Sequence, residues 1–112
     1  MTPKRCDLLL LPFPFSNLAA SKRRPVVALT NPDRYGDFVA LAVTSRPQTE
    51  YAVALTPAGL AEGVLPAPSW IRTSRVVTLN TSLVVKILGR VSEHIVTEAA
   101  KRLCSYLKAP GA

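Results

Sequence analysis

The chain has few of the residue types that build disulfide frameworks, zinc sites and histidine-based active sites. Its 112 residues include two cysteines and one histidine. Cys6 and Cys104 are too few and too far apart for a disulfide or zinc framework, so we expect both to be buried as small apolar residues. The single histidine, His94, falls in the first turn of an expected helix, where an exposed side chain is the better interpretation. We therefore predict no metal site and no cofactor.

Long apolar segments are also missing. No run of apolar residues is long enough to cross a bilayer, which argues against a membrane protein. Lys4 and Arg5 precede only a short apolar run that Pro12 interrupts, so we predict no signal peptide and a cytoplasmic location. The chain also lacks internal repeats, linkers and low-complexity segments, and its length suits a single domain over residues 1–112.

Acidic residues are scarce compared with basic ones. The chain has 14 lysines and arginines against seven aspartates and glutamates, a formal net charge of +7. Such an excess on a small domain favours binding to a polyanion, because the complex releases the polyanion's counterions. The cations gather near Lys22–Arg24 and Arg72–Arg75, which favours a nucleic-acid partner over a protein that is merely basic.

Short apolar and β-branched runs, bounded by proline, glycine and asparagine, predict five to seven strands. We expect them at Asp7–Leu11, Pro25–Thr30, Phe38–Thr44, Tyr51–Leu55, Trp70–Leu79 (as one or two segments) and Val85–Val91, with an irregular stretch over Gly63–Pro68.

In the last segment of the chain, the spacing of apolar residues changes from that of strands to that of a helix. An apolar stripe at helical spacing follows Ser92, a suitable N-cap, and consists of Ile95, Val96, Ala99, Ala100, Leu103, Cys104 and Leu107. A series of short strands followed by one helix predicts a mainly β fold with a C-terminal helix, closed into a small and compact, partly closed barrel.

The second and third strands predict their own register. In a hairpin centred near Arg34, one face pairs large apolar residues throughout, as a barrel interior requires: Pro25–Val43, Val27–Leu41 and Leu29–Val39. A slip of one residue would mix the two faces. The other face, Val26, Ala28, Ala40 and Ala42, is apolar as well. One helix cannot cover both, so we expect this outer face to be exposed in the monomer and buried in a homodimer.

The same register brings Arg24 opposite Thr44, with Cβ atoms roughly 5 Å apart. Both residues stand where their strands emerge into loops, beside Lys22 and Arg23. A guanidinium and a hydroxyl that converge beside further cations suit a phosphate group. An arginine that caps the sheet edge next to a turn threonine would give the same pattern, so the register alone leaves both interpretations open.

The chain resembles the MazF/PemK toxin family along nearly its whole length. The resemblance rests on an ordered set of short motifs: Lys4-Arg5-x-Asp7, Phe13-Pro14-Phe15, Arg24-Pro25 at the start of a strand, Thr44-Ser45 at the end of one, Ser69-Trp70-Ile71-Arg72, Leu79-Asn80-x-Ser82-Leu83 and Gly89-Arg90-Val91-Ser92.

The resemblance implies a small SH3-like β-barrel of the MazF/PemK/CcdB-like kind that forms a homodimer. It implies a toxin that cuts single-stranded RNA, including mRNA, at short sequences without a metal. The cut leaves a 2′,3′-cyclic phosphate and inhibits translation and growth, and a cognate acidic antitoxin neutralises the toxin. The family's catalytic arginine and threonine fall on Arg24 and Thr44, and an arginine used by some members falls on Arg72. We predict further RNA contacts from neighbouring loop residues: Phe15, Ser21, Lys22, Arg23, Ser45 and Arg46.

Two positions depart from the family pattern. Cys6 stands where the family has glycine, so a turn that needs positive φ would strain this residue. Ser74 stands where some relatives have aspartate, which leaves the proposed site without an obvious general base. A barrel that binds nucleic acid without cutting it is therefore an alternative. A more remote one is a gyrase-poisoning toxin of related fold, although the chain has no aromatic C-terminal end.

Overall fold

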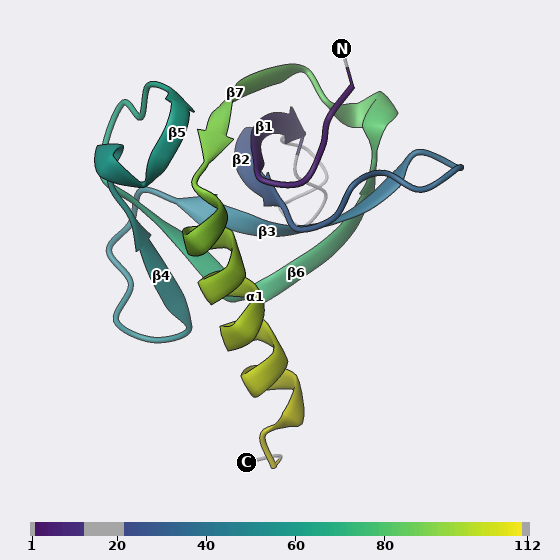
Figure 1. Cartoon of the computed structure of the whole chain (residues 1–112). Helices are drawn as coiled ribbons and strands as arrows, with labels where there is room; N and C mark the ends of the chain where they lie inside the picture. The colour runs from purple at the N-terminus through teal and green to yellow at the C-terminus, as the bar shows by residue number, and fades with distance from the viewer. Residues whose placement is uncertain (1, 13–21, 111–112) are drawn as a thin grey trace.

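The computed structural model describes residues 2–12 and 22–110 and confirms a mainly β fold with a C-terminal helix (Figure 1). The strands are β1 (Asp7–Pro12), β2 (Arg23–Ala28), β3 (Asp37–Thr44), β4 (Ala52–Leu55), β5 (Leu60–Gly63), β6 (Ser69–Asn80) and β7 (Lys86–Val91). Two short 3₁₀ helices, η1 (Pro57–Gly59) and η2 (Thr81–Leu83), follow β4 and β6, and the helix α1 (Glu93–Lys108) follows β7.

The strands form one antiparallel sheet in the order β4-β6-β3-β2-β1-β7-β5. The sheet curls strongly: in Figure 1, β7 passes above β1 and β2, while β3 and β6 pass below them. The longest strand, β6, has 12 residues and pairs with both β3 and β4. This half-barrel is the partly closed barrel that the strand pattern predicts.

The strand β5 is the element that the sequence pattern misses. Its four residues, Leu-Ala-Glu-Gly, include no β-branched side chain. Pairing with β7 creates the strand, because Gly63 approaches Gly89 so closely that a Cβ on Gly63 would lie 2.7 Å from the Gly89 Cα. Gly63 also has a φ of +89°, a conformation that favours glycine. Tertiary contact therefore decides this element, and local propensity does not.

The predicted register of β2 and β3 is confirmed. Val26 pairs with Ala42, Val27 with Leu41 and Ala28 with Ala40. The hairpin closes at a turn in which the Asp33 carboxylate accepts hydrogen bonds from the backbone N–H groups of Tyr35 and Asp37, at 2.8 and 3.0 Å. The register and the turn together fix which residues of the two strands reach the far end of the hairpin.

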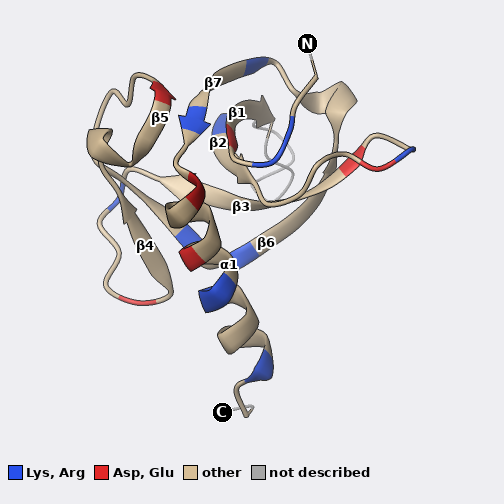
Figure 2. Ribbon diagram, in the orientation of Figure 1, with Lys and Arg blue, Asp and Glu red and all other residues tan. Residues whose placement is uncertain are grey.

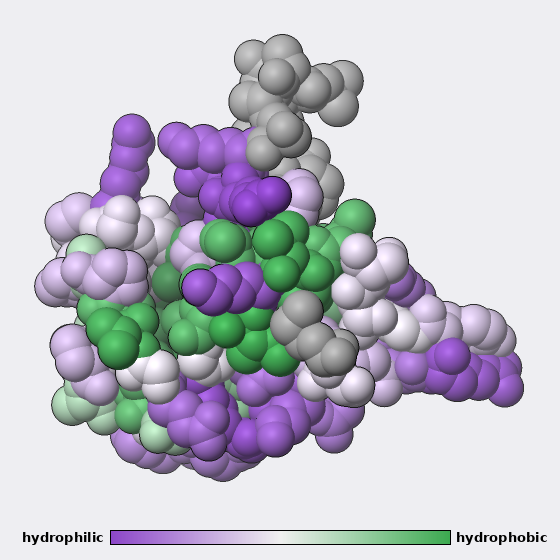
Figure 3. All heavy atoms as spheres, turned by 90° about the horizontal axis from the view of Figure 1, so that it is seen from above, coloured by the Kyte–Doolittle hydropathy of each residue, from purple (hydrophilic) through white to green (hydrophobic). Residues whose placement is uncertain are grey.

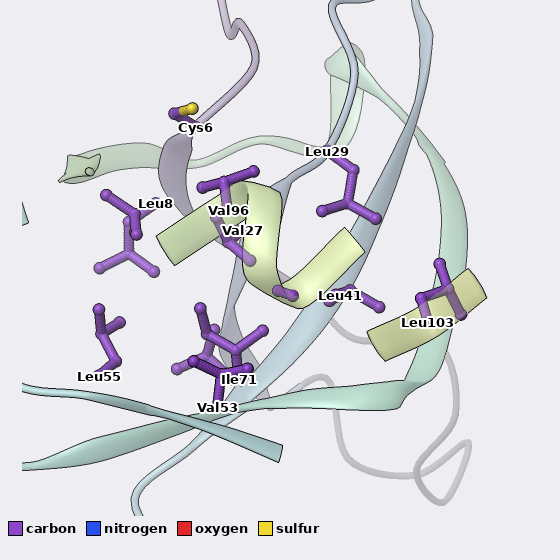
Figure 4. Close-up of a cluster of buried hydrophobic side chains, with 13 residues drawn as sticks. Cys6, Leu8, Val27, Leu29, Leu41, Val53, Leu55, Ile71, Val96 and Leu103 are labelled. Atoms are coloured by element: carbon purple, nitrogen blue, oxygen red, sulfur yellow. The ribbon is translucent and has the colours of Figure 1, made fainter. Parts of the chain in front are cut away.

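One face of the sheet packs against α1, as Figure 4 shows. Val27 and Leu41 of the central hairpin meet Ile71 of β6 and Val96 of α1 in this core, and all four are fully buried. This is the face that the register predicts to be interior.

The prediction that the other face is exposed in the monomer is wrong. Val26, Ala28 and Ala40 are buried in a second core, and Ala42 is partly buried against it. The other buried members of this core are Leu9, Leu11, Phe38, Val77 and Leu79. The curl of the sheet explains the difference. It packs side chains from several strands of this face against one another, so the face is buried without a helix or a second protomer to cover it.

The helix α1 buries only part of its predicted stripe. Val96, Ala99 and Leu103 are buried, whereas Leu107 is 66% exposed and Cys104 is exposed. The expectation that both cysteines are buried is therefore wrong for Cys104. In Figure 1 the last turns of α1 extend beyond the sheet, where Tyr106 packs edge-on against Tyr51 with ring centroids 5.3 Å apart. Within the described residues, no helix has the length and apolar composition needed to cross a membrane.

Candidate functional site

A broad cleft of about 1240 Å³ opens where several strands end. Its lining comes from the start of β2, the end of β3, the middle of β6, the start of β7 and the β5–β6 connection. Seven of the residues that line it are basic, namely Lys22, Arg23, Arg24, Arg46, Arg72, Arg75 and Lys86, and no described acidic residue lines it. None of the seven forms an ion pair with another described residue.

The acidic residues lie elsewhere on the molecule. Figure 2 shows them at the start of β1, on the β2–β3 hairpin, in the first turns of α1, at the tip of β5 and in the loop before β4. The cleft therefore combines a strong positive potential with cationic side chains that have no partner to displace. Such a site attracts an anion with several charges.

Arg24 and Thr44 reach the cleft from neighbouring strands. The last pair between β2 and β3 toward the cleft joins Val26 to Ala42. Arg24 stands two residues before Val26, and Thr44 stands two residues after Ala42, so the same register sets Arg24 opposite Thr44. Arg24 lies opposite Leu11 of β1, and Thr44 lies opposite Trp70 of β6. Both residues line the cleft. The two residues that the register predicts to converge thus share one site.

The hydroxyl of Thr44 has a defined orientation. Its Oγ1 accepts a hydrogen bond from the backbone N–H of Arg46 at 3.1 Å. Because a lone pair of the oxygen serves this contact, its O–H proton remains available to donate into the cleft. Thr44 is half-buried and Arg24 is exposed. The pair therefore offers a guanidinium and a hydroxyl donor to one bound anion.

A bulge in β6 supplies two more arginines. Ile71 pairs with Val43, and the next pair between these strands joins Val76 to Leu41. Four residues of β6, 72–75, therefore lie opposite Ala42 alone. Bulges turn side chains out of their regular alternation, and here both Arg72 and Arg75 line the cleft. Arg72 keeps its pairing to Ala52 of β4, which holds its backbone in place.

The structure places most of the predicted site residues together. All seven that it describes line the cleft: Lys22, Arg23, Arg24, Thr44, Ser45, Arg46 and Arg72. Phe15 and Ser21 lie outside the described residues. Arg75, part of the predicted Arg72–Arg75 cluster of cations, lines the cleft too, although it was not predicted as a site residue. Lys86 also lines the cleft and was missed, because an isolated surface cation gives no sequence signal until the sheet topology is known.

One wall of the cleft, Val64–Ala67, is apolar and also escaped prediction. It comes from the β5–β6 connection, where Val64, Leu65, Pro66 and Ala67 line the space. Val64 is 81% exposed, an unusual state for a large apolar side chain. The Ser69 hydroxyl donates a hydrogen bond to the carbonyl of Ala67 at 3.0 Å and fastens the end of this connection. The cleft thus combines cationic side chains with this exposed apolar wall.

No described residue that lines the cleft is a histidine, aspartate, glutamate or cysteine. His94 is exposed on α1, as expected, and Ser74 does not line the cleft. Among residues 2–12 and 22–110, no cluster of three or more such side chains could hold a metal ion. The lining therefore offers hydrogen-bond donors and positive charge, but no obvious proton acceptor.

Cys6 has the strained backbone that its place in the opening motif predicts. Its φ is +77°, and its side chain is buried. The thiol donates a hydrogen bond to the Glu93 carboxylate at 2.8 Å, and Arg5 also contacts this carboxylate at 2.9 Å. Burial, followed by the hydrogen bond to Glu93, raises the pKa of Cys6 to about 11. The hydrogen bonds from Cys6 and Arg5 lower the pKa of Glu93.

Solved structures of similar fold are MazF proteins and endoribonucleases. MazF from Deinococcus radiodurans superimposes with a TM-score of 0.74 at 22% identity, over 97% of this chain and 99% of that one. An endoribonuclease from a mycobacterial species gives 0.73 at 19% identity, over 100% and 97%. A mycobacterial endoribonuclease in complex with its cognate antitoxin gives 0.71 at 18% identity, over 98% and 99%. These likenesses establish the fold.

A comparison with curated proteins found no match. The sequence itself matches the family described as PemK-like, MazF-like toxin of type II toxin-antitoxin system over residues 4–107. The match covers the cleft, the bulge of β6 and the helix α1. The chain belongs to the PemK-like, MazF-like toxins of type II toxin–antitoxin systems.

Proposed function

We propose that this protein is an endoribonuclease that cuts single-stranded RNA, including mRNA, in the cationic cleft without a metal ion. The observation that carries the proposal is the convergence of Arg24 and Thr44 on one wall of a cleft whose other described cations are unpaired. The structures of similar fold include endoribonucleases, which supports the same activity. In a cell the activity would inhibit translation and growth in the cytoplasm.

The chemistry follows from the donors in the cleft. The ribose 2′-oxygen attacks the adjacent phosphorus and loses its proton, while the bond from phosphorus to the 5′-oxygen breaks. The products are a 2′,3′-cyclic phosphate and a 5′-hydroxyl, which gains a proton. Arg24 gives two parallel N–H donors to the equatorial oxygens, and Thr44 donates its hydroxyl to the same group. Arg72 adds positive charge beside the departing 5′-oxygen.

The absence of a described histidine or carboxylate from the lining shapes the mechanism. Arginine and threonine are poor bases near neutral pH. We infer that water or hydroxide takes the 2′ proton, and that the protein accelerates the reaction by positioning the phosphate and stabilising its charge. One well-placed donor of this kind contributes about 3 kcal/mol to transition-state stabilisation.

The test is incubation of purified protein with a long RNA in the presence of EDTA. Primer extension locates the cuts and reports sequence preference, and chemical analysis of the ends identifies the cyclic phosphate. The missing base favours one competing function, a barrel that binds nucleic acid without cutting it. Stoichiometric RNA binding with no cut under these conditions would establish that alternative and refute the enzyme.

The proposal includes an acidic antitoxin segment that orders only as it binds. Acidic side chains would pair with Lys22, Arg23 and Arg72, while apolar ones would cover the wall around Val64. The cations that hold RNA would then hold the inhibitor as well, so the two should compete. A solved mycobacterial relative in complex with its antitoxin supports a partner of this kind.

We also propose a homodimer, through a different surface from the one that the register argument suggests. That face is buried within the chain, whereas Leu83 and Val85, which precede β7, are 41% and 39% exposed. Figure 3 shows an apolar area on this side of the molecule, bordered by hydrophilic side chains. Sedimentation that gives a monomer at micromolar concentration would reject the dimer.

A further inference from the structure

Two cations of the cleft have no role in the proposed cleavage. Arg75 lies in the bulge of β6, and Lys86 is the first residue of β7. Both side chains are exposed, and both line the cleft. Neither forms an ion pair with another described residue. Their charges therefore do not hold the fold together, and they remain available to an anion in the cleft.

These two cleft residues come from strands that lie four places apart in the sheet order, β6 and β7. Lys86 pairs with Leu10 of β1, and Leu10 pairs with Pro25 of β2. The β2–β3 register, continued by one residue, sets Pro25 opposite Val43 of β3, and Val43 pairs with Ile71 of β6. Four spacings between neighbouring strands separate β7 from β6, about 19 Å along the curled sheet. The Arg24 and Thr44 pair belongs to β2 and β3, which lie between β6 and β7 in the sheet order.

We propose that Arg75 and Lys86 bind backbone phosphates at the two ends of an RNA track that crosses the strands from β6 to β7. The proposal rests on the proposed function and names the path of its substrate. A single strand carries a phosphate at every nucleotide, so cations spread along one wall suit it better than a single small anion. The bases then face the apolar wall of Val64–Ala67.

The track makes the substrate longer than the two nucleotides beside the cut bond. Contacts at Arg75 and Lys86 lie away from the reacting phosphate, so they hold the strand in place and take no part in bond breaking. They also do not read the sequence, because phosphates are the same at every position. Their contribution therefore appears in affinity and in its dependence on salt.

The experiment measures binding separately from cleavage. A fluorescent 2′-O-methyl RNA of 12 nucleotides and mixed sequence cannot be cut, because its 2′-oxygen cannot attack. Anisotropy at several salt concentrations gives the slope of log K against log salt for the wild type, Arg75→Gln, Lys86→Gln and the double variant. Each single variant should lower the magnitude of the slope by about 0.7, and the double variant by about 1.4.

Matched controls come from α1. Lys101→Gln and Lys108→Gln remove exposed cations outside the cleft, and their slopes should equal that of the wild type. Thermal melting confirms that each variant is folded. Slopes of the Arg75 and Lys86 variants equal to those of the α1 controls would overturn the track. If the Arg75 and Lys86 variants show the smaller salt slope but the wild type never cuts ordinary RNA, the proposed function would be rejected and the RNA track would be supported.

Discussion

Replacing Arg24 with lysine tests the proposed chemistry most directly. The change keeps a positive charge but removes the planar pair of N–H donors that can meet two oxygens of one phosphate. Arg24 is exposed and has no ion-pair partner among the described residues, so the fold loses no such contact. The loss of one preorganised donor predicts a fall in kcat of about 100- to 1,000-fold, or about 3 to 4 kcal/mol.

The assay is single-turnover cleavage of a labelled RNA in EDTA, with protein in excess over RNA. Arg34→Lys is the matched control, because Arg34 is exposed at the tip of the β2–β3 hairpin and does not line the cleft. The control should cut at the wild-type rate, and both variants should melt at the wild-type temperature. Cleavage by Arg24→Lys at a near wild-type rate would show that Arg24 supplies charge alone, or that the bond is cut elsewhere.

Three further outcomes follow from the structure. Without a base in the described lining, the single-turnover rate should rise about tenfold per pH unit between pH 6 and 9, and His94→Ala should not change this profile. A plateau near pH 7 would reveal a titrating base. The pKa of Cys6 is raised from 9.0 to about 11 in the folded protein, so its neutral thiol contributes to the free energy of unfolding below pH 9. This contribution is lost as the pH rises to 11. Denaturant titrations should therefore show the wild type losing about 2 kcal/mol more than Cys6→Ala over that range, and equal losses would reject the buried thiol. Charge reversal of Lys22 and Arg23 should weaken RNA and antitoxin binding together, while added salt should weaken RNA binding more. An acidic partner that binds without displacing RNA would contradict a shared cleft.

The sequence predicts the register of the central hairpin because its two faces differ in composition. Large residues such as Val27 and Leu41 alternate with smaller ones such as Ala28 and Ala40, and only one register keeps the two sets apart. That alternation separates the faces but does not say what covers each one. Coverage depends on the curl of the whole sheet, which gathers side chains of other strands, such as Leu11 of β1 and Leu79 of β6, with the face predicted to be exposed.

The missed parts of the site depend on pairing between strands. The segment from Trp70 to Leu79 reads as ordinary β sequence, and its bulge appears only because β6 must pair with both β3 and β4. Arg75 reaches the cleft from that bulge. Lys86 reaches it because β7 lies beside β1, a neighbour distant in sequence. The sequence marks Arg72–Arg75 as a cluster of cations but not its place in the site, and Lys86 has no local signal. Arg24 and Thr44, by contrast, stand at the ends of strands that the sequence does predict.

The departure at Cys6 lies at the opposite end of β2 from Arg24. The N–H of Cys6 donates to the carbonyl of Ala28, the last residue of β2, whereas Arg24 lies near the start of that strand. Four residues of extended chain separate the two positions by about 13 Å. Cys6 does not line the cleft, and its thiol points to Glu93 at the first turn of α1. The cysteine therefore keeps the left-handed turn that glycine would make, adds a part-buried hydrogen bond between the residue before β1 and the first turn of α1, and leaves Arg24 and Thr44 in place.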